Sequence, residues 1–172
     1  MNKKIGMILL LLLTMITGCL DESTSSGQND FRQQQALEDE SKNIMIIKQY
    51  VKEILNKGNL AAADVIIGDD FVDPAAKPGE KGPESLKKVI FSFRNIFPDL
   101  SVTIDDMVVG KESIAWKWTA KGTNQGVIFG IAPTNKNVTF SGIIIDKIKD
   151  GKIIQRHGIW DRMGLKNQLL RK

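Results

Sequence analysis

The sequence contains few of the residues that form most reactive centres. Its 172 residues include one cysteine, one histidine and one tyrosine. A lone cysteine cannot form an internal disulfide, and one cysteine with one histidine cannot supply the ligands of a zinc or other transition-metal site. The sequence also has no glycine-rich phosphate loop and no nucleophile elbow. It therefore predicts a protein without a disulfide framework, a metal or another cofactor.

An excess of charge of one sign is also missing. The chain has 24 Lys and Arg against 20 Asp and Glu, and the basic residues are scattered along it. Two of them, Lys3 and Lys4, lie in the N-terminal segment described next, so the rest of the chain carries an excess of only two. Because nucleic-acid-binding proteins gather positive charge on one face, we expect no nucleic-acid partner. The length fits one globular domain.

The only long apolar run stands at the N-terminus. Residues 5–16 are almost wholly apolar, follow two lysines, and lead into Ile16-Thr17-Gly18-Cys19. The run is too short for a comfortable membrane span and lies where a signal peptide lies. This pattern resembles the lipobox of prokaryotic lipoprotein precursors. The resemblance implies a signal peptide at residues 1–18, lipidation of Cys19, and an extracytoplasmic protein held to the cell membrane by that lipid alone. The alternative is a buried N-terminal core helix.

The next segment is polar. Residues 19–40 are rich in Ser, Gln, Asp and Glu and contain few large apolar side chains. Such a composition cannot bury enough surface to fold by itself, so it predicts a flexible tether between the lipidated Cys19 and a domain at residues 41–172.

The first half of the domain has a helical pattern. Apolar residues at 44, 47, 51 and 54 predict an amphipathic helix that ends at Gly58, and residues 59–66 predict a shorter one. Residues 68–83 hold three prolines and three glycines and predict a loop. Pro83 suits the first position of a third helix, which Pro98 ends.

The second half alternates with the period of strands. Residues 100–105, 114–121, 137–149 and 152–160 predict four strands, Asp150-Gly151 predicts a type I′ hairpin turn, and residues 163–170 predict a last short helix. Helices followed by strands predict an α+β fold, a curved antiparallel sheet packed on three N-terminal helices with a pocket at its open end.

Several segments together resemble a known family. They are residues 97–100 (FPDL), 115–123 (AWKWTAKGT), 129–136 (FGIAPTNK), 138–143 (VTFSGI), 150–154 (DGKII) and 160–165 (WDRMGL). In this order and spacing they resemble the SnoaL-like polyketide cyclases of the nuclear-transport-factor-like superfamily, over roughly residues 43–170. The resemblance implies a cone-shaped fold and a ring-closing aldol reaction on an ester substrate, without cofactor or metal. Superfamily relatives include isomerases, dehydratases and domains that only bind.

The resemblance also implies site residues. Asp161 matches the position of the cyclases' catalytic aspartate, and as a base it needs a pKa raised by desolvation. The alternative role for Asp161 is the N-cap of the last helix. His157 shares a face of the last strand with Asp161, roughly 13 Å away, and would be its polar partner. Gln155 lies on the same face as a second polar group.

Aromatic side chains are first of all core, and some could line a pocket for an apolar ligand. The candidates for ligand binding, with Gln155, are Phe71, Phe93, Phe97, Trp116, Trp118, Phe129 and Phe140. Two departures from the family weaken the case for catalysis. Residues 143–145 are all isoleucine where family enzymes often have a polar residue, and the histidine stands one position later than in many relatives.

Three functions follow as alternatives. The first is a cofactor-independent ester cyclase, or a related lyase or isomerase, with Asp161 as base and His157 as partner. The second is a non-catalytic extracytoplasmic module that binds a small hydrophobic or ester-bearing molecule. The third is an interaction domain, since the resemblance allows a homodimer through the open sheet face.

Overall fold

The computed structural model describes residues 22–171. It divides the chain into two compact units, one ending at Glu38 and one running from Asp39 to the C-terminus. The predicted signal peptide at residues 1–18 and Cys19 lie outside the described residues, so both stay predictions.

The described part of the first unit, which falls within the predicted tether, is helical. Helix α1 (Glu22–Gln49) includes all of its described residues, and the side chains of residues 28–38 are almost all exposed. The described part of the predicted tether thus has a regular helical backbone, and its role as a tether stays a prediction. Gln, Ala, Leu and Glu in residues 33–38 are strong helix formers, and a helix satisfies its own backbone groups without needing a buried face.

The second unit starts with the end of α1 and two short helical segments. A π-helical stretch (Tyr50–Asn56) follows α1 directly, and its wide turns bury four side chains, Tyr50, Val51, Ile54 and Leu55. The chain ends this helix at Gly58, which has a φ of +69°, as the sequence predicts. A 3₁₀ turn (Leu60–Ala62) and the one-turn helix α2 (Ala63–Ile66) form the predicted second helix.

The expected loop at residues 68–83 is partly a strand. Strand β1 (Ile67–Val72) pairs in parallel with β5 (Lys152–Trp160), the last strand in the sequence, and only residues 73–81 are irregular. Gly68, Asp69 and Asp70 hide this strand from a propensity argument, because these residue types are rare in strands. Helix α3 (Gly82–Ile96) then begins with Pro83 in its first turn, as predicted.

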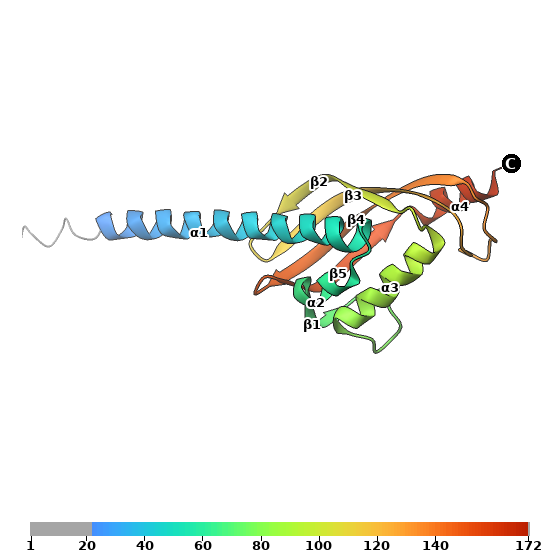
Figure 1. The fold of residues 1–172 in the computed structure, drawn as a ribbon. Coiled ribbons are helices and arrows are strands. Elements are labelled where there is room, and N and C mark those ends of the chain that lie inside the picture. The colour runs from blue at the N-terminus through green and yellow to red at the C-terminus, as the bar shows by residue number, and fades with distance from the viewer. Residues whose placement is uncertain (1–21, 172) are drawn as a thin grey trace, which may run out of the picture. The chain divides into compact units, whose positions relative to one another are not determined.

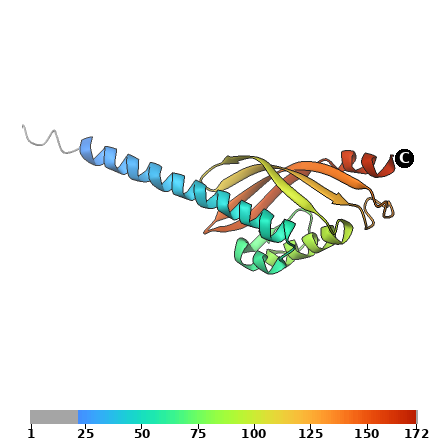
Figure 2. The same ribbon diagram turned by 45° about the horizontal axis from the view of Figure 1, so that its top comes forward.

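The sheet has five strands. β2 (Ser101–Val109), β3 (Ser113–Thr123), β4 (Asn137–Lys149) and β5 (Lys152–Trp160) form an antiparallel meander, and the spatial order is β1-β5-β4-β3-β2. Asp150 and Gly151 both have positive φ, as a type I′ turn requires. Helix α4 (Arg162–Leu170) ends the described chain. Figures 1 and 2 show the curved sheet with α2 and α3 on one of its faces.

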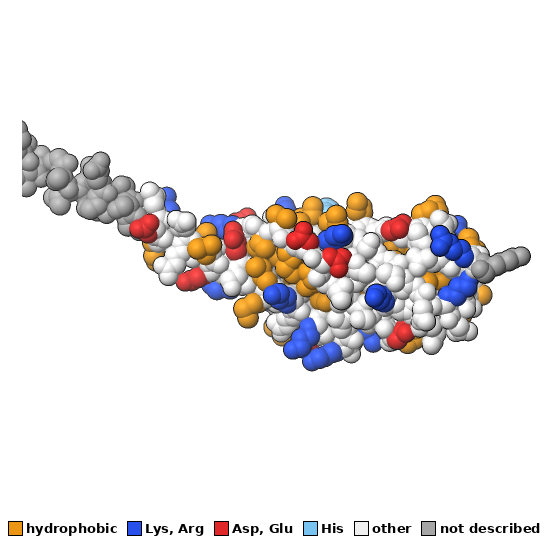
Figure 3. Space-filling model, turned by 90° about the horizontal axis from the view of Figure 1, so that it is seen from above, with side chains coloured by type: hydrophobic (Ala, Val, Ile, Leu, Met, Phe, Trp, Pro, Cys, Tyr) orange, Lys and Arg blue, Asp and Glu red, His pale blue; other side chains and the backbone are white. Residues whose placement is uncertain are grey.

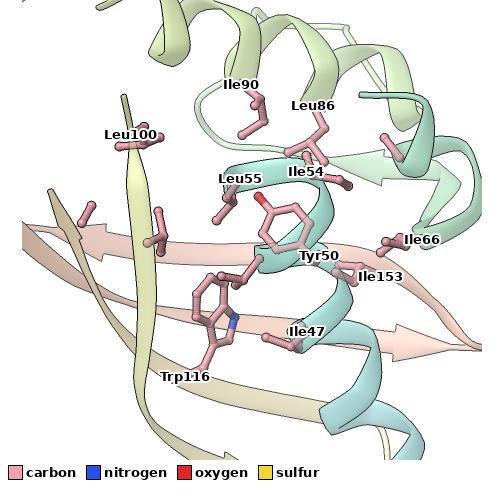
Figure 4. Close-up of a cluster of buried hydrophobic side chains, with 14 of the residues drawn as sticks. Ile47, Tyr50, Ile54, Leu55, Ile66, Leu86, Ile90, Leu100, Trp116 and Ile153 are labelled. Atoms are coloured by element: carbon pink, nitrogen blue, oxygen red, sulfur yellow. The ribbon is translucent and has the colours of Figure 1, made fainter. Parts of the chain in front are cut away.

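The core lies between that face of the sheet and the helices. Figure 4 shows Tyr50 between Trp116 of β3 and the α3 side chains Leu86 and Ile90. Ile47, Ile54 and Ile153 are completely buried around it. The molecule is thus an α+β fold of the predicted class, with one correction, since β1 makes the sheet mixed rather than wholly antiparallel.

The surface gives no sign of a basic stripe on the face seen from above, where Lys and Arg are interspersed with Asp and Glu (Figure 3). Among the helices of residues 22–171, none combines the length and the apolar character needed to cross a bilayer.

Candidate functional site

The floor of a cavity is formed by three rows of side chains across β3, β4 and β5. Strand pairing aligns Trp118 with Gly142 and Trp160, then Trp116 with Ile144 and Gly158, then Ile114 with Asp146 and Arg156. Glycines leave space in the first two rows, at Gly142 and Gly158. The third row carries the polar groups of Asp146 and Arg156. At Gly142 a Cβ atom would stand 2.7 Å from both Trp118 and Trp160, so only glycine lets both indoles pack here.

The roof of the cavity is apolar. Val89, Ile90 and Phe93 of α3 face the floor across a cavity of about 180 Å³. β1 pairs with β5 only as far as Gln155, so the second half of β5 is open on that side. Asp73, Pro74 and Ala75, from the loop after β1, also line the cavity.

A β-bulge decides which side chains of β5 enter the cavity. Ile148 pairs with Ile153 but Lys147 pairs with Gln155, so Ile154 is an extra residue. The buried Ile153 and the buried Arg156 therefore share the inner face although they are three residues apart. Beyond the bulge, the inward positions are 156, 158 and 160 instead of 155, 157 and 159.

This bulge overturns the predicted position of the polar pair. His157 is exposed on the outer face of the sheet, opposite Ile145, and its Nε2 lies 2.7 Å from Nε2 of Gln155. Neither residue lines the cavity. The prediction that they face a shared pocket with Asp161 is wrong, because it assumed an unbroken alternation along β5.

Asp161 is the N-cap of α4. Its Oδ1 accepts a hydrogen bond of 2.7 Å from the backbone N–H of Gly164, and the side chain is exposed. It lies outside the cavity under α3. Of the two roles that the sequence left open, the geometry provides the cap, and it does not provide the desolvated environment that a basic aspartate needs.

The predicted aromatic residues divide into two groups. Phe93, Trp116, Trp118 and Phe140 line the cavity. Phe71 and Phe97 are completely buried in the core, and Phe129 stacks on Trp160 at a centroid distance of 6.1 Å instead of lining the cavity. Trp160, which the sequence analysis did not assign to the site, is a lining residue.

The polar end of the cavity contains a buried network that the sequence analysis missed. Nε and Nη2 of Arg156 donate to the two carboxylate oxygens of Asp146 at 2.8 and 3.0 Å, and Nη1 donates to the Tyr50 hydroxyl at 2.6 Å. Asp146 also accepts from Nε1 of Trp116 at 2.9 Å. An Asp and an Arg ten residues apart on a predicted hairpin were the only sequence signal, and the bulge obscured that they face each other.

The network fixes the protonation of its members. Burial raises the pKa of Tyr50, although the charge of Arg156 and its hydrogen bond act in the opposite direction. Burial lowers the pKa of Arg156, but the charges of Asp146 and Tyr50 and the hydrogen bonds to both together more than compensate, so this pKa lies above its usual value. Tyr50 is therefore a neutral hydroxyl and Arg156 a permanent cation.

Two further polar groups lie at the cavity. Asp73 is only 7% exposed, and its Oδ1 accepts from the backbone N–H of Ala75 at 2.7 Å. Nε1 of Trp118 is buried and has no hydrogen-bond partner. A buried donor without a partner costs about 1–3 kcal/mol, so it marks a place where a ligand acceptor would be stabilising. Within residues 22–171, no three His, Cys, Asp or Glu side chains are arranged to hold a metal ion.

Comparison with known proteins decides the family. The family model of the SnoaL-like polyketide cyclases matches residues 45–169. The chain belongs to this family. No curated protein matches the sequence significantly.

Solved structures of similar proteins have the same fold. TsrD from Streptomyces laurentii is 26% identical with a TM-score of 0.68, over 76% of this chain and 96% of TsrD. A candidate polyketide cyclase from Acidithiobacillus ferrooxidans is 25% identical with a TM-score of 0.67, over 74% of this chain and 94% of the other. A SnoaL-like polyketide cyclase from Agrobacterium tumefaciens shares the fold at 16% identity and a TM-score of 0.63, over 72% of this chain and 94% of the other. The matched region makes up nearly the whole of each of those chains.

In this SnoaL-like domain, residues 124–136 form an ordered connection between β3 and β4. Asn124 is completely buried, and its side chain donates to the carbonyl of Gly126 and accepts from the backbone N–H and the hydroxyl of Thr134. In the middle of the segment, the ring of Phe129 stacks on Trp160, and the guanidinium of Arg162 lies over both rings. The segment thus packs against the side chain of Trp160.

The outer face of the same sheet carries exposed apolar side chains. Ile143 and Ile145 are about half exposed, at 48% and 49%, and Ile159 is 78% exposed. Ile143 pairs with Ile159 across β4 and β5, so they form a small patch. The homodimer through this face stays a prediction.

Proposed function

We propose that this SnoaL-like domain binds a small, mainly apolar molecule in the cavity under α3. The observation that carries the proposal is an apolar cavity, one of whose lining residues, Trp118, has a buried Nε1 without a hydrogen-bond partner. A cavity with many apolar walls and a few polar groups is the usual form of a small-molecule site. The family resemblance supports a binding site of this kind, while the cap role of Asp161 removes the support for Asp161 catalysis.

The proposal includes the location of the domain. The lipobox-like sequence ending at Cys19 supports export and lipidation, so binding would take place outside the cytoplasm at the membrane surface. In the sequence, residues 20–38 lie between Cys19 and the domain that starts at Asp39, and they would serve as the tether.

Calorimetric titration of residues 39–172 with 2-naphthol tests the binding proposal. Ile90→Trp places a larger side chain in the cavity and should weaken binding by at least about tenfold, since excluded apolar area is worth more than about 1.4 kcal/mol. Phe91→Trp changes the neighbouring residue of α3, whose side chain is exposed and outside the cavity, and should leave binding unchanged. Absence of any binding by the parent domain would refute the proposal.

A second candidate function has one specific observation in its favour. Asp73 and Tyr50 line the same cavity, and a carboxylate with a neutral hydroxyl is the minimal set for enolising a carbonyl compound. Proton exchange at the carbon beside the carbonyl of 2-tetralone in D₂O, followed by NMR, tests this cyclase- or isomerase-type chemistry. Catalysis requires faster exchange with the parent domain and loss of the effect in Asp73→Asn. Equal exchange rates with and without protein would rule out this catalysis, and binding would remain as the only proposed function.

A further inference from the structure

The polar end of the cavity has a definite hydrogen-bonding character. Three of the five N–H groups of Arg156 are occupied, by Asp146 twice and by the Tyr50 oxygen once. Because the Tyr50 oxygen acts as acceptor toward Arg156, its own hydrogen remains available. The raised pKa of Tyr50 keeps this hydrogen in place across neutral pH. The polar end therefore offers a donor at Tyr50.

The same end also offers an acceptor. Oδ1 of Asp73 is bound to the Ala75 N–H, while Oδ2 has no hydrogen-bond partner among the described residues. Asp73 lies near enough to Tyr50 for its charge to raise the pKa of the tyrosine. A group that both accepts from Tyr50 and donates to Asp73 is a hydroxyl.

The charge at this end is negative. Arg156 and Asp73 are the only charged residues that line the cavity in the described part of the chain. The positive charge of Arg156 is neutralised by the completely buried Asp146 behind it. Asp73 thus leaves one net negative charge beside the ligand head group, which repels a carboxylate in a poorly hydrated site.

The opposite end of the floor offers a second donor. Trp118 stands in the row of Trp160, two rows from that of Arg156, and successive inward residues on a strand are about 6.6 Å apart. The Cα atom of Trp118 therefore lies roughly 13 Å along the floor from the row of Arg156, and its Nε1 is a buried donor without a partner. An acceptor atom at the far end of an apolar ligand would satisfy it.

Building on the proposed binding function, we propose that the cavity selects an uncharged apolar molecule with a hydroxyl at one end and a hydrogen-bond acceptor at the other, and rejects carboxylates. The hydroxyl lies between Tyr50 and Asp73, and the acceptor lies at Nε1 of Trp118. A fatty-acid or polyketide-acid anion is thereby excluded as the preferred ligand.

Three probes of one shape test the head group. Residues 39–172 are titrated by calorimetry with naphthalene, 2-naphthol and 2-naphthoate. Two added hydrogen bonds should make 2-naphthol bind about tenfold tighter than naphthalene. The like charge of Asp73 should make 2-naphthoate bind at least about tenfold more weakly than 2-naphthol. Equal or tighter binding of 2-naphthoate overturns the proposed selectivity but leaves the binding function intact, whereas no binding of any probe overturns both.

Matched variants assign the effect to named groups. Asp73→Asn keeps an acceptor for the Ala75 N–H and removes the charge, so it should bring 2-naphthoate to within about threefold of 2-naphthol. Asp70→Asn makes the same change of charge at an exposed β1 residue outside the cavity and should alter neither affinity. Tyr50→Phe removes one of the two hydrogen bonds and should reduce the preference for 2-naphthol over naphthalene to about threefold. Selectivity that survives both cavity variants overturns the proposal.

One NMR signal tests whether the acceptor of the ligand lies at Trp118. The indole ¹⁵N–H signal of Trp118, assigned by its loss in Trp118→Phe, should move downfield when 6-methoxy-2-naphthol binds, because its N–H then gains an acceptor. It should move much less with 2-naphthol, which lacks the second oxygen. An unmoved Trp118 signal with bound 6-methoxy-2-naphthol contradicts the proposed place of the acceptor.

Discussion

At the scale of single residues, Tyr50 has a feature that makes it unusually accessible to experiment. It is the only tyrosine in the chain, it is 1% exposed, and its hydroxyl accepts from Arg156. Any tyrosinate absorbance of the folded protein therefore comes from this one side chain within the cavity wall.

We predict that Tyr50 ionises above pH 10.0 in the folded domain, because burial raises its pKa from that value. The folded state then holds the proton more tightly than the unfolded state. This contribution to stability is complete below pH 10.0 and is lost as pH rises toward the folded pKa. Absorbance at the tyrosinate band should titrate above pH 10.0, and Tyr50→Phe should reduce the alkaline loss of stability in urea unfolding. Titration below that value would contradict the described burial.

Asp161 matches a catalytic position of the family in the sequence, but in the structure it accepts from the Gly164 N–H and caps helix α4. The Asp161→Ala variant loses the hydrogen bond to the Gly164 N–H, so the free energy of unfolding should fall by about 0.5–2 kcal/mol. Asp161→Ser, which keeps a capping oxygen, should lose less. Affinity for 2-naphthol should be the same in all three proteins, since Asp161 lies outside the cavity. A loss of binding in Asp161→Ala with unchanged stability would reverse the assignment.

At the scale of elements, the sequence predicted the helices and strands better than the face each strand presents. The apolar residues of α3, the turn at Asp150-Gly151 and the four long strands all follow from local patterns and are confirmed. Strand β1 does not, since its pairing with β5 is decided by tertiary contact and its Gly68, Asp69 and Asp70 oppose strand formation.

The bulge at Ile154 caused the largest error in the predicted candidate site. One extra residue exchanges inner and outer faces for the rest of β5, so Arg156 replaces His157 in the cavity wall. Nothing in the residues 152–156 marks the bulge, because isoleucine stands at both 153 and 154 and either could be buried. Strand alternation alone therefore could not identify the site.

The connection between β3 and β4 depends on the buried side chain of Asn124. We predict that Asn124→Ala lowers the free energy of unfolding by about 1–3 kcal/mol, because the Thr134 N–H and the Gly126 carbonyl lose their partner. Amide hydrogen exchange within residues 124–136 should accelerate. Gln125→Ala removes an exposed amide one residue away and serves as the control with no expected change. Unchanged exchange in Asn124→Ala would show that the backbone hydrogen bonds of the segment and the Phe129 stack hold it without the Asn124 side chain.

At the scale of the whole molecule, the sequence predicted the fold class and the family, but it did not predict the polar residues of the cavity. Length and the order of helices before strands gave the α+β fold, and the quoted segments indicated the family that the comparison then showed. The polar network of Tyr50, Asp146 and Arg156 joins residues up to 106 positions apart, and only the folded chain brings them together.

The remaining prediction concerns the attachment of the molecule to a membrane. Cys19 is the only cysteine, so incorporation of radioactive palmitate into the protein reports on this residue alone. When the full chain is expressed in a bacterium that processes lipoproteins, it should be labelled and should sediment with membranes until detergent releases it.

The Cys19→Ser variant should remain unlabelled, because an oxygen nucleophile does not replace the thiol that lipidation requires. Its domain should still bind 2-naphthol with the parent affinity, since the cavity residues all lie within the unit that begins at Asp39. Palmitate labelling that persists in Cys19→Ser, or a parent chain without label, would remove the lipid anchor and with it the reason to place the binding site at a membrane surface. The binding function itself would stand, since it rests on the cavity and not on the anchor.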